Sequence, residues 1–148
     1  MLPVALIAVI AIVAGLSVWL KAARGRRELD RHSITPEALR DLLKVNPQAL
    51  LFDVRQPLDL LADSEVIPGA RRVPPKEIQE NAERVPRDRE VVVYCTCASD
   101  RTALEITKRA HALKFFKIKF LKGGLEAWKQ KGYPVEPYRE TFHLDTAT

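Results

Sequence analysis

Two cysteines and an arginine share one short segment of this 148-residue chain. Cys95 follows the apolar run Val91–Tyr94, and Arg101 lies six residues further on. Ligands of open α/β sheets bind at the carboxyl ends of the strands, which is where Cys95 is expected to lie. A turn that ends at a helix N-terminus points backbone N–H groups at an anion and makes a thiol more acidic. The segment therefore predicts a thiolate nucleophile at Cys95, with Arg101 as a cation suited to tetrahedral oxyanions.

The sequence alone leaves other roles open for these residues. A lone cysteine after a strand is most often a small buried apolar residue. A Cys-x-Cys pair can bind a metal, but neither a second pair nor a nearby histidine motif accompanies it, so no metal is expected. Cys97 is either structural or a second thiol that receives sulfur from Cys95 or forms a disulfide with it. Asp100 either opposes thiolate formation or pairs with Arg101.

Strand-like and helical segments alternate along the chain after residue 33. Strands are expected at 49–55, 71–73, 91–94 and 118–121, and helices at 57–62, 75–85, from 101 and from 124. An earlier helix is expected to start within Ser33–Glu37, with Thr35 as its cap and Pro36 in its first turn. Strands separated by helices indicate an α/β fold, in which a parallel sheet has helices on both faces.

The first twenty residues predict a membrane anchor. The run Leu2–Leu20 has no charged side chain, and as a helix it would be about 28 Å long, close to the thickness of a bilayer core. A cleaved signal peptide would have a basic N-terminus and a shorter apolar core. A buried helix of a soluble domain is the other alternative. We expect a transmembrane anchor at 1–20, a basic juxtamembrane linker at 21–32 that is either irregular or a continuation of the anchor helix, a folded domain at 33–137 and a tail at 138–148.

The charge around the anchor predicts its orientation. Lys21, Arg24, Arg26 and Arg27 follow the apolar run with no acidic residue among them. Basic flanks stay in the cytoplasm, so the N-terminus is expected outside and the domain inside, in a single-pass protein of the cell membrane. A reducing compartment also suits free thiols. Lipid is therefore an expected partner of residues 2–20.

The overall charge excludes some classes of function. The chain has a formal charge of +5, but residues 28–148 contain 20 basic and 19 acidic residues. A nearly neutral body is not typical of a nucleic-acid-binding protein, so no nucleic acid partner is expected. Two cysteines are too few for a secreted domain that disulfides stabilise.

From about Ser33 to Pro137 the chain resembles a single-domain rhodanese, a thiosulfate sulfurtransferase. Four blocks carry the resemblance, in the order of the family: Leu51–Arg55 with Pro57, Ile67–Ala70, Val92–Cys95, and Phe120–Trp128 followed by Gly132–Val135. The resemblance implies a rhodanese-like parallel sheet flanked by helices on both faces, here preceded by one transmembrane helix.

The resemblance also implies a reaction. Cys95 would take a sulfane sulfur as a persulfide from a small donor such as thiosulfate or another persulfide, and pass it to a thiol or cyanide. Such a carrier intermediate predicts ping-pong kinetics and needs no cofactor. The substrate-binding loop would use the backbone amides of Thr96, Cys97, Ala98, Ser99, Asp100 and Arg101.

Two departures from the family pattern keep alternatives open. Ser64–Val66 stands where the family usually has Gly-His, and the loop Cys95–Arg101 has seven residues and no glycine, where the family loop has six. A Cys-x5-Arg loop is similar to that of dual-specificity phosphatases and arsenate reductases on the same fold, in which Cys95 would attack phosphorus or arsenic. Tyr94 replaces the histidine that usually precedes the phosphatase cysteine. A non-catalytic, membrane-tethered binding module is the third possibility.

Overall fold

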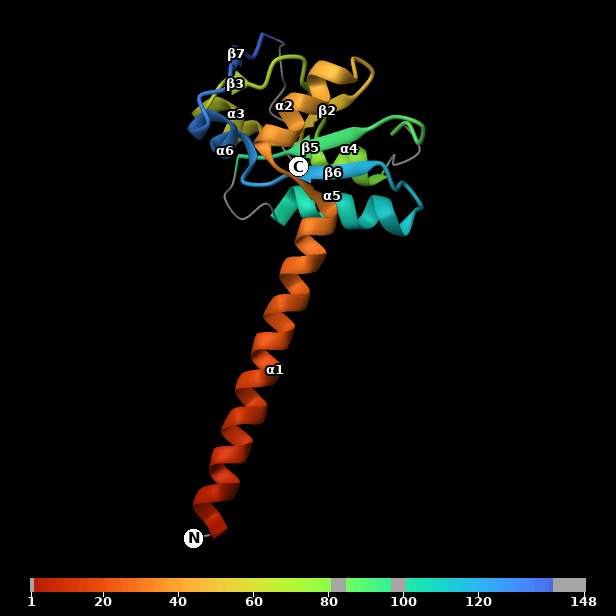
Figure 1. Cartoon of the computed structure of the whole chain (residues 1–148). Helices are drawn as coiled ribbons and strands as arrows, with labels where there is room; N and C mark the ends of the chain where they lie inside the picture. The colour runs from red at the N-terminus through yellow and green to blue at the C-terminus, as the bar shows by residue number, and fades with distance from the viewer. Residues whose placement is uncertain (1, 81–84, 97–100, 140–148) are drawn as a thin grey trace, which may run out of the picture. The chain divides into compact units, whose positions relative to one another are not determined.

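The computed structural model describes residues 2–80, 85–96 and 101–139 (Figure 1). The chain divides into two compact units, Met1–Arg31 and His32–Thr148. The first unit is nearly all of one helix, α1 (Leu2–His32). The second unit contains all the strands and the remaining helices.

Helix α1 is long and apolar enough to cross a membrane over Leu6–His32. Its large apolar side chains from Leu6 to Leu20 are exposed, among them Ile12 and Trp19, and none of its most apolar window is buried in the protein. The basic segment 21–32 continues the same helix, which is one of the two alternatives that the sequence leaves open for it.

The second unit is built on a five-stranded sheet in which every pairing is parallel. The strand order is β1 (Ser33–Ile34), β6 (Ile118–Leu121), β5 (Val91–Tyr94), β2 (Leu50–Asp53) and β4 (Arg71–Arg72). A separate antiparallel pair joins β3 (Glu65–Val66) to β7 (Glu136–Pro137). The helices are α2 (Pro36–Val45), α3 (Pro57–Ala62), α4 (Pro75–Glu80), α5 (Arg101–Ala112) and α6 (Gly124–Gln130).

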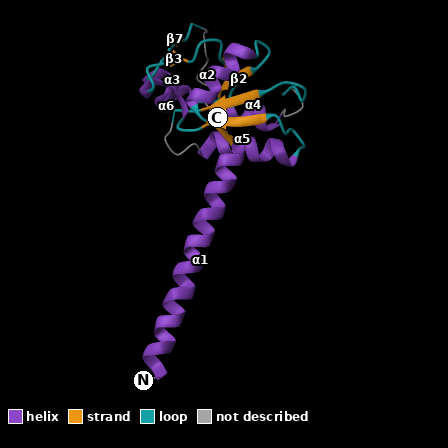
Figure 2. Cartoon of the chain, viewed as in Figure 1, coloured by secondary structure: helices purple, strands orange, loops and turns teal. Residues whose placement is uncertain are grey.

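Alternation along the central strand explains why helices cover both faces of the sheet. All four residues of β5 are buried. Val91 and Val93 pack in one core cluster with residues of α4 and α5, whereas Val92 and Tyr94 pack in another with residues of α2 and α6. A strand buried on both sides is typical of a parallel sheet between helices (Figure 2). The predicted α/β architecture is confirmed.

Local sequence signals set several element ends. Thr35 caps α2, because its hydroxyl accepts a hydrogen bond from the amide of Ala38, and Pro36 takes the first turn, as predicted. The predicted helix start within Ser33–Glu37 is confirmed, and Ser33–Ile34, just before the cap, form β1 opposite Phe120 and Leu121. Two residues are too few to show a strand pattern, and the same holds for β3 and β7.

Candidate functional site

Cys95 lies where the sequence places it, directly after the carboxyl end of β5. It is a thiol, and only 4% of its surface is exposed. Its side chain belongs to the same apolar cluster as Val54 and Ala103. The burial fits both the structural role that the sequence leaves open and a nucleophile that is shielded from water.

Helix α6 holds the backbone of Cys95 from the other side. The amide of Leu125 donates to the Cys95 carbonyl oxygen at 2.9 Å. Gly124 has φ +57°, and a Cβ atom there would stand less than 3.0 Å from that oxygen, closer than real Cβ atoms approach. Gly123, with φ +75°, turns the chain into the helix. The Gly-Gly pair is therefore required for α6 to begin against Cys95.

The residue before Cys95 is fixed at both its backbone and its side chain. The carbonyl of Tyr94 accepts from the amide of Val54 at 2.9 Å, and its phenol oxygen accepts from the amide of Ile67 at 3.3 Å. Burial, and next the negative charge of Asp53, raise the pKa of Tyr94 well above its ordinary value. Tyr94 is thus a neutral structural group at neutral pH.

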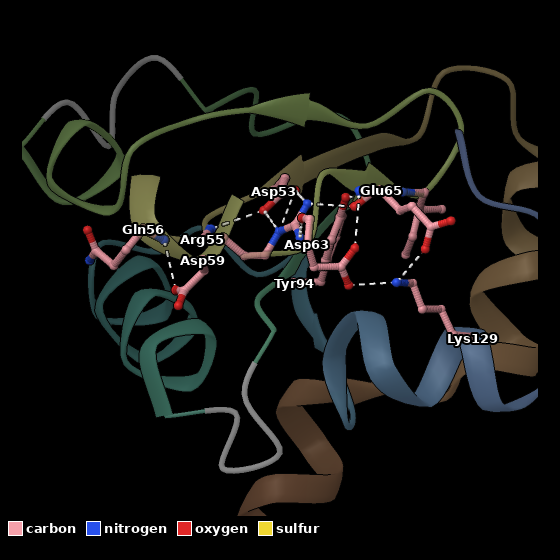
Figure 3. Close-up of polar contacts among 9 residues, drawn as sticks. Asp53, Arg55, Gln56, Asp59, Asp63, Glu65, Tyr94 and Lys129 are labelled. Atoms are coloured by element: carbon pink, nitrogen blue, oxygen red, sulfur yellow. Dashed lines mark hydrogen bonds and ion pairs between the residues drawn. The ribbon is translucent and has the colours of Figure 1, made fainter. Parts of the chain in front are cut away.

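A buried ion pair lies at the end of the neighbouring strand β2. Asp53 and Arg55 are at most 1% exposed, and their closest nitrogen–oxygen distance is 2.6 Å (Figure 3). Arg55 also donates to the backbone oxygens of Asp63 and Glu65, at 2.8 Å each. Burial disfavours the charged guanidinium, but the hydrogen bonds to Asp53 outweigh it and raise the pKa of Arg55. Every charge in this pair is compensated, as burial requires.

Lys129 connects helix α6 to the same region. Its ammonium pairs with the carboxylate of Asp63 at 2.6 Å and also with Glu65 (Figure 3). The helix that supports the Cys95 carbonyl is therefore held at Asp63–Glu65 as well. The helix predicted to open at Gly123–Gly124 is confirmed as α6. The structural role of Asp53 and Arg55 was missed, because these residues were used only as marks of resemblance, although an Asp-x-Arg at the end of a buried strand is a signal for an ion pair.

The predicted binding loop is described only at its ends. Thr96 is partly buried, and its hydroxyl oxygen is enclosed with no hydrogen-bond partner in the described part of the chain. Arg101 is exposed and begins α5, so the predicted helix start after the loop is confirmed. Cys97, Ala98, Ser99 and Asp100 lie outside the described residues. The structure thus brings Cys95, Thr96 and the N-terminus of α5 to one edge of the sheet.

Two bacterial proteins are similar to this chain in sequence. The probable adenylyltransferase/sulfurtransferase MoeZ of Mycobacterium tuberculosis is 35% identical over 105 residues, which are 69% of this chain and 26% of MoeZ. The chain therefore spans about a quarter of the length of that relative. A sulfurtransferase of Allochromatium vinosum is 28% identical over 104 residues, 70% of this chain and 94% of the relative.

Solved structures share the fold. The human single-domain sulfurtransferase TSTD1 superposes with a TM-score of 0.55 at 24% identity, covering 68% of this chain and 96% of the human protein. The family model of the Rhodanese-like domain matches residues 35–131, which include β5, Cys95 and helix α6. The chain belongs to the rhodanese-like domain family.

Proposed function

We propose that this protein is a membrane-anchored sulfurtransferase that carries sulfane sulfur on Cys95. The observation that supports it most is the backbone around Cys95: the cysteine directly follows a central parallel strand, and the amide of Leu125 in α6 holds its carbonyl oxygen at 2.9 Å. The family match and two relatives that are named sulfurtransferases support the same activity.

The proposed reaction has two steps. The Cys95 thiolate attacks the outer sulfur of thiosulfate, a new S–S bond forms, and the old S–S bond breaks with its electron pair leaving on sulfite. The acceptor, cyanide or a thiolate, then attacks the outer sulfur of the Cys95 persulfide, giving thiocyanate or a new persulfide and restoring the thiolate. No external oxidant or reductant is needed, because each step exchanges one sulfur–sulfur bond for another bond to sulfur.

The site would stabilise negative charge at two places. The loop amides of residues 96–101 would surround the persulfide, and the twelve-residue helix α5 begins at Arg101, so its positive end faces this edge. Arg101 is exposed at the start of α5, where it would contact an anionic donor at the rim. Thr96 would lie next to the reacting sulfur.

Helix α1 would anchor the site at a membrane. Its apolar part is long enough to span a bilayer, and Lys21, Arg24, Arg26 and Arg27 follow it. By the distribution of these charges the N-terminus lies outside and the rhodanese-like domain in the cytoplasm. The physiological donor would then be a cytoplasmic molecule that reaches the membrane surface.

Intact-mass analysis of the full chain in detergent tests the activity. After incubation with thiosulfate we expect a mass gain of one sulfur atom, which cyanide discharges as thiocyanate. Cys95→Ser should show no gain, whereas Cys97→Ser, the matched thiol control, should keep it. A gain in Cys95→Ser would refute the assignment. No gain of mass in the wild type, together with hydrolysis of a phosphate ester, would favour the hypothesis that the seven-residue loop is that of a phosphatase.

A further inference from the structure

The turn between α5 and β6 exposes apolar and basic side chains together. Leu113 is 47% exposed and Phe116 is 68% exposed, and the neighbouring Lys114 and Lys117 are exposed as well. We call residues 113–117 the α5–β6 turn. It lies in the most basic stretch of the domain, because no acidic residue occurs between Glu105 and Glu126. The basic residues of that stretch are Lys108, Arg109, Lys114, Lys117, Lys119 and Lys122.

The backbone of the turn determines which side chains point outward. The amide of Lys114 donates to the carbonyl of His111 and that of Phe115 to Ala110, both at 2.9 Å. This is the hydrogen-bond pattern of a helix end at which the next residue adopts a left-handed conformation. Phe115 is consequently buried at 3% exposure, and Phe116 is left on the surface.

Lys114 occupies the left-handed position, with φ 65°. It is the only non-glycine residue with positive φ in the described part of the chain. Glycine is the usual residue there, because a side chain costs free energy in this conformation. Lys114 takes this conformation at a cost in free energy, and its side chain is exposed on the turn, which fits a function for its charge.

The α5–β6 turn lies near His32, the first residue after the unit Met1–Arg31. The ring of His111 lies 6.0 Å from that of Phe116 and 4.4 Å from that of His32, centroid to centroid. The same imidazole contacts the carbonyl oxygen of Ile118 at 3.0 Å through Nε2. His32 comes twelve residues after Leu20, the last residue of the uncharged run, and twelve helical residues span about 18 Å.

We propose that the α5–β6 turn is a membrane-contact surface for anionic phospholipid headgroups. Leu113 and Phe116 fit the interfacial region, where apolar side chains enter a few ångströms, and the lysines match the negative charge of the leaflet. Lys117 also donates to the backbone oxygen of Asp88, which holds its ammonium at this face. The proposal rests on the proposed anchor, because the tether would keep the turn close to the bilayer.

The contact would leave the cysteine accessible. The α5–β6 turn precedes β6, so it lies at the amino edge of the sheet, whereas Cys95 follows the parallel strand β5 at the carboxyl edge. A domain that rests on lipid with its amino edge therefore turns its candidate active site away from the membrane, toward donors and acceptors in solution.

Quenching of an indole in the turn tests the contact. The full chain with Trp19→Phe and Phe116→Trp is placed in nanodiscs of bromine-labelled phosphatidylcholine, with or without phosphatidylglycerol. We expect about twofold quenching of the introduced indole only with phosphatidylglycerol, and its loss on adding Lys114→Glu and Lys117→Glu. The chain with Trp19→Phe alone is the control, because its remaining Trp128 is 3% exposed and should stay unquenched.

Two results would overturn the proposal. One is equal emission from position 116 with and without phosphatidylglycerol, and the other is quenching that survives the charge reversals. The unsubstituted chain separates this failure from failure of the anchor. Quenching of Trp19 in the same nanodiscs would mean that the anchor is inserted and only the turn proposal is wrong, whereas an unquenched Trp19 would refute the anchor.

Discussion

The two edges of the parallel sheet use charge in opposite ways. At the carboxyl edge, Asp53 and Arg55 are almost completely buried and bonded to each other, next to the strand that Cys95 follows. At the amino edge, Lys114 and Lys117 are exposed beside apolar Phe116. Buried, paired charges fix a geometry, whereas exposed charges stay available to a partner. The difference indicates that the charges of the carboxyl edge position the backbone, whereas those of the amino edge fit the proposed contact with lipid.

The largest effect is expected where the carboxyl edge is tightest, at Gly124. In Gly124→Ala the new Cβ would overlap the carbonyl oxygen of Cys95, so the backbone of the cysteine or of α6 must shift. A displacement of about 1 Å costs on the order of a hundredfold in rate. The rate of persulfide formation, followed by quenched-flow intact mass, checks the prediction.

Gly132→Ala is the matched control for this substitution. Gly132 also has a positive φ, +69°, but a Cβ atom there meets nothing within 4 Å. It carries the same kind of backbone cost, about 1 kcal/mol, without the overlap. Its persulfide rate should stay near the wild-type rate. If both alanine variants lose the rate equally, the contact between Gly124 and Cys95 is not the cause.

The buried ion pair should dominate stability at the carboxyl edge. Asp53→Ala leaves the guanidinium of Arg55 buried without its carboxylate, which typically costs about 3–5 kcal/mol of unfolding free energy. Urea unfolding of the detergent-solubilised chain, followed by Trp128 fluorescence, measures it. Asp41→Ala is the control, because Asp41 and its partner Arg40 are exposed, and such pairs contribute about 0–1 kcal/mol. Equal losses of unfolding free energy in the two variants would contradict the distinction between the buried and the exposed ion pair.

At the amino edge we expect a substitution that raises the free energy of unfolding rather than lowers it. Lys114→Gly removes a side chain from φ 65° and should stabilise the domain by about 1 kcal/mol. The same substitution removes one positive charge from the α5–β6 turn, so it should weaken the lipid-dependent quenching. Urea unfolding and nanodisc quenching of one variant measure both. Lys117→Gly is the comparison, because it removes a charge without relieving a positive φ. A gain of stability in Lys117→Gly as well would mean that the positive φ of Lys114 is not the cause.

Much of the carboxyl edge was predictable, and the reason is local sequence. The apolar run before Cys95 predicted both its strand and its place at the strand's end, and Thr35 predicted the cap of α2. The contact between Tyr94 and Asp53 was not predictable, because it joins neighbouring strands 41 positions apart in the chain.

The amino edge was harder to predict, because its main feature is the backbone conformation of one residue, Lys114. Nothing in the residue types marks Lys114 as left-handed, because glycine or asparagine would be the usual signal. The basic excess around it was masked in the net charge of the domain, which acidic residues elsewhere cancel. The predicted loop residues 97–100 remain a prediction, as does the orientation of the anchor.

The smallest effect is expected at Lys129, where the carboxyl edge meets solvent. Burial disfavours the charged form of Asp63, but the hydrogen bond from Lys129 outweighs it, so the pKa of Asp63 lies below its ordinary value. Such a carboxylate contributes stability above its unfolded pKa of about 3.9 and loses that contribution as pH falls through the lower, folded pKa. Because Lys129 and Asp63 are each about one quarter to one third exposed, the contribution should stay below about 1 kcal/mol.

Lys129→Met should therefore lower stability slightly at neutral pH and flatten the acid side of the pH–stability curve. Lys131→Met is the control on the same end of α6, since its partner Glu37 belongs to α2 rather than to the segment that Arg55 holds. Both variants should lose a little stability, but only Lys129→Met should also slow persulfide formation, because only Lys129 holds α6 to Asp63 and Glu65. If Lys131→Met slows the reaction as much, the position of α6 against Cys95 does not depend on the carboxyl-edge charges, and the contrast between the two edges concerns stability alone.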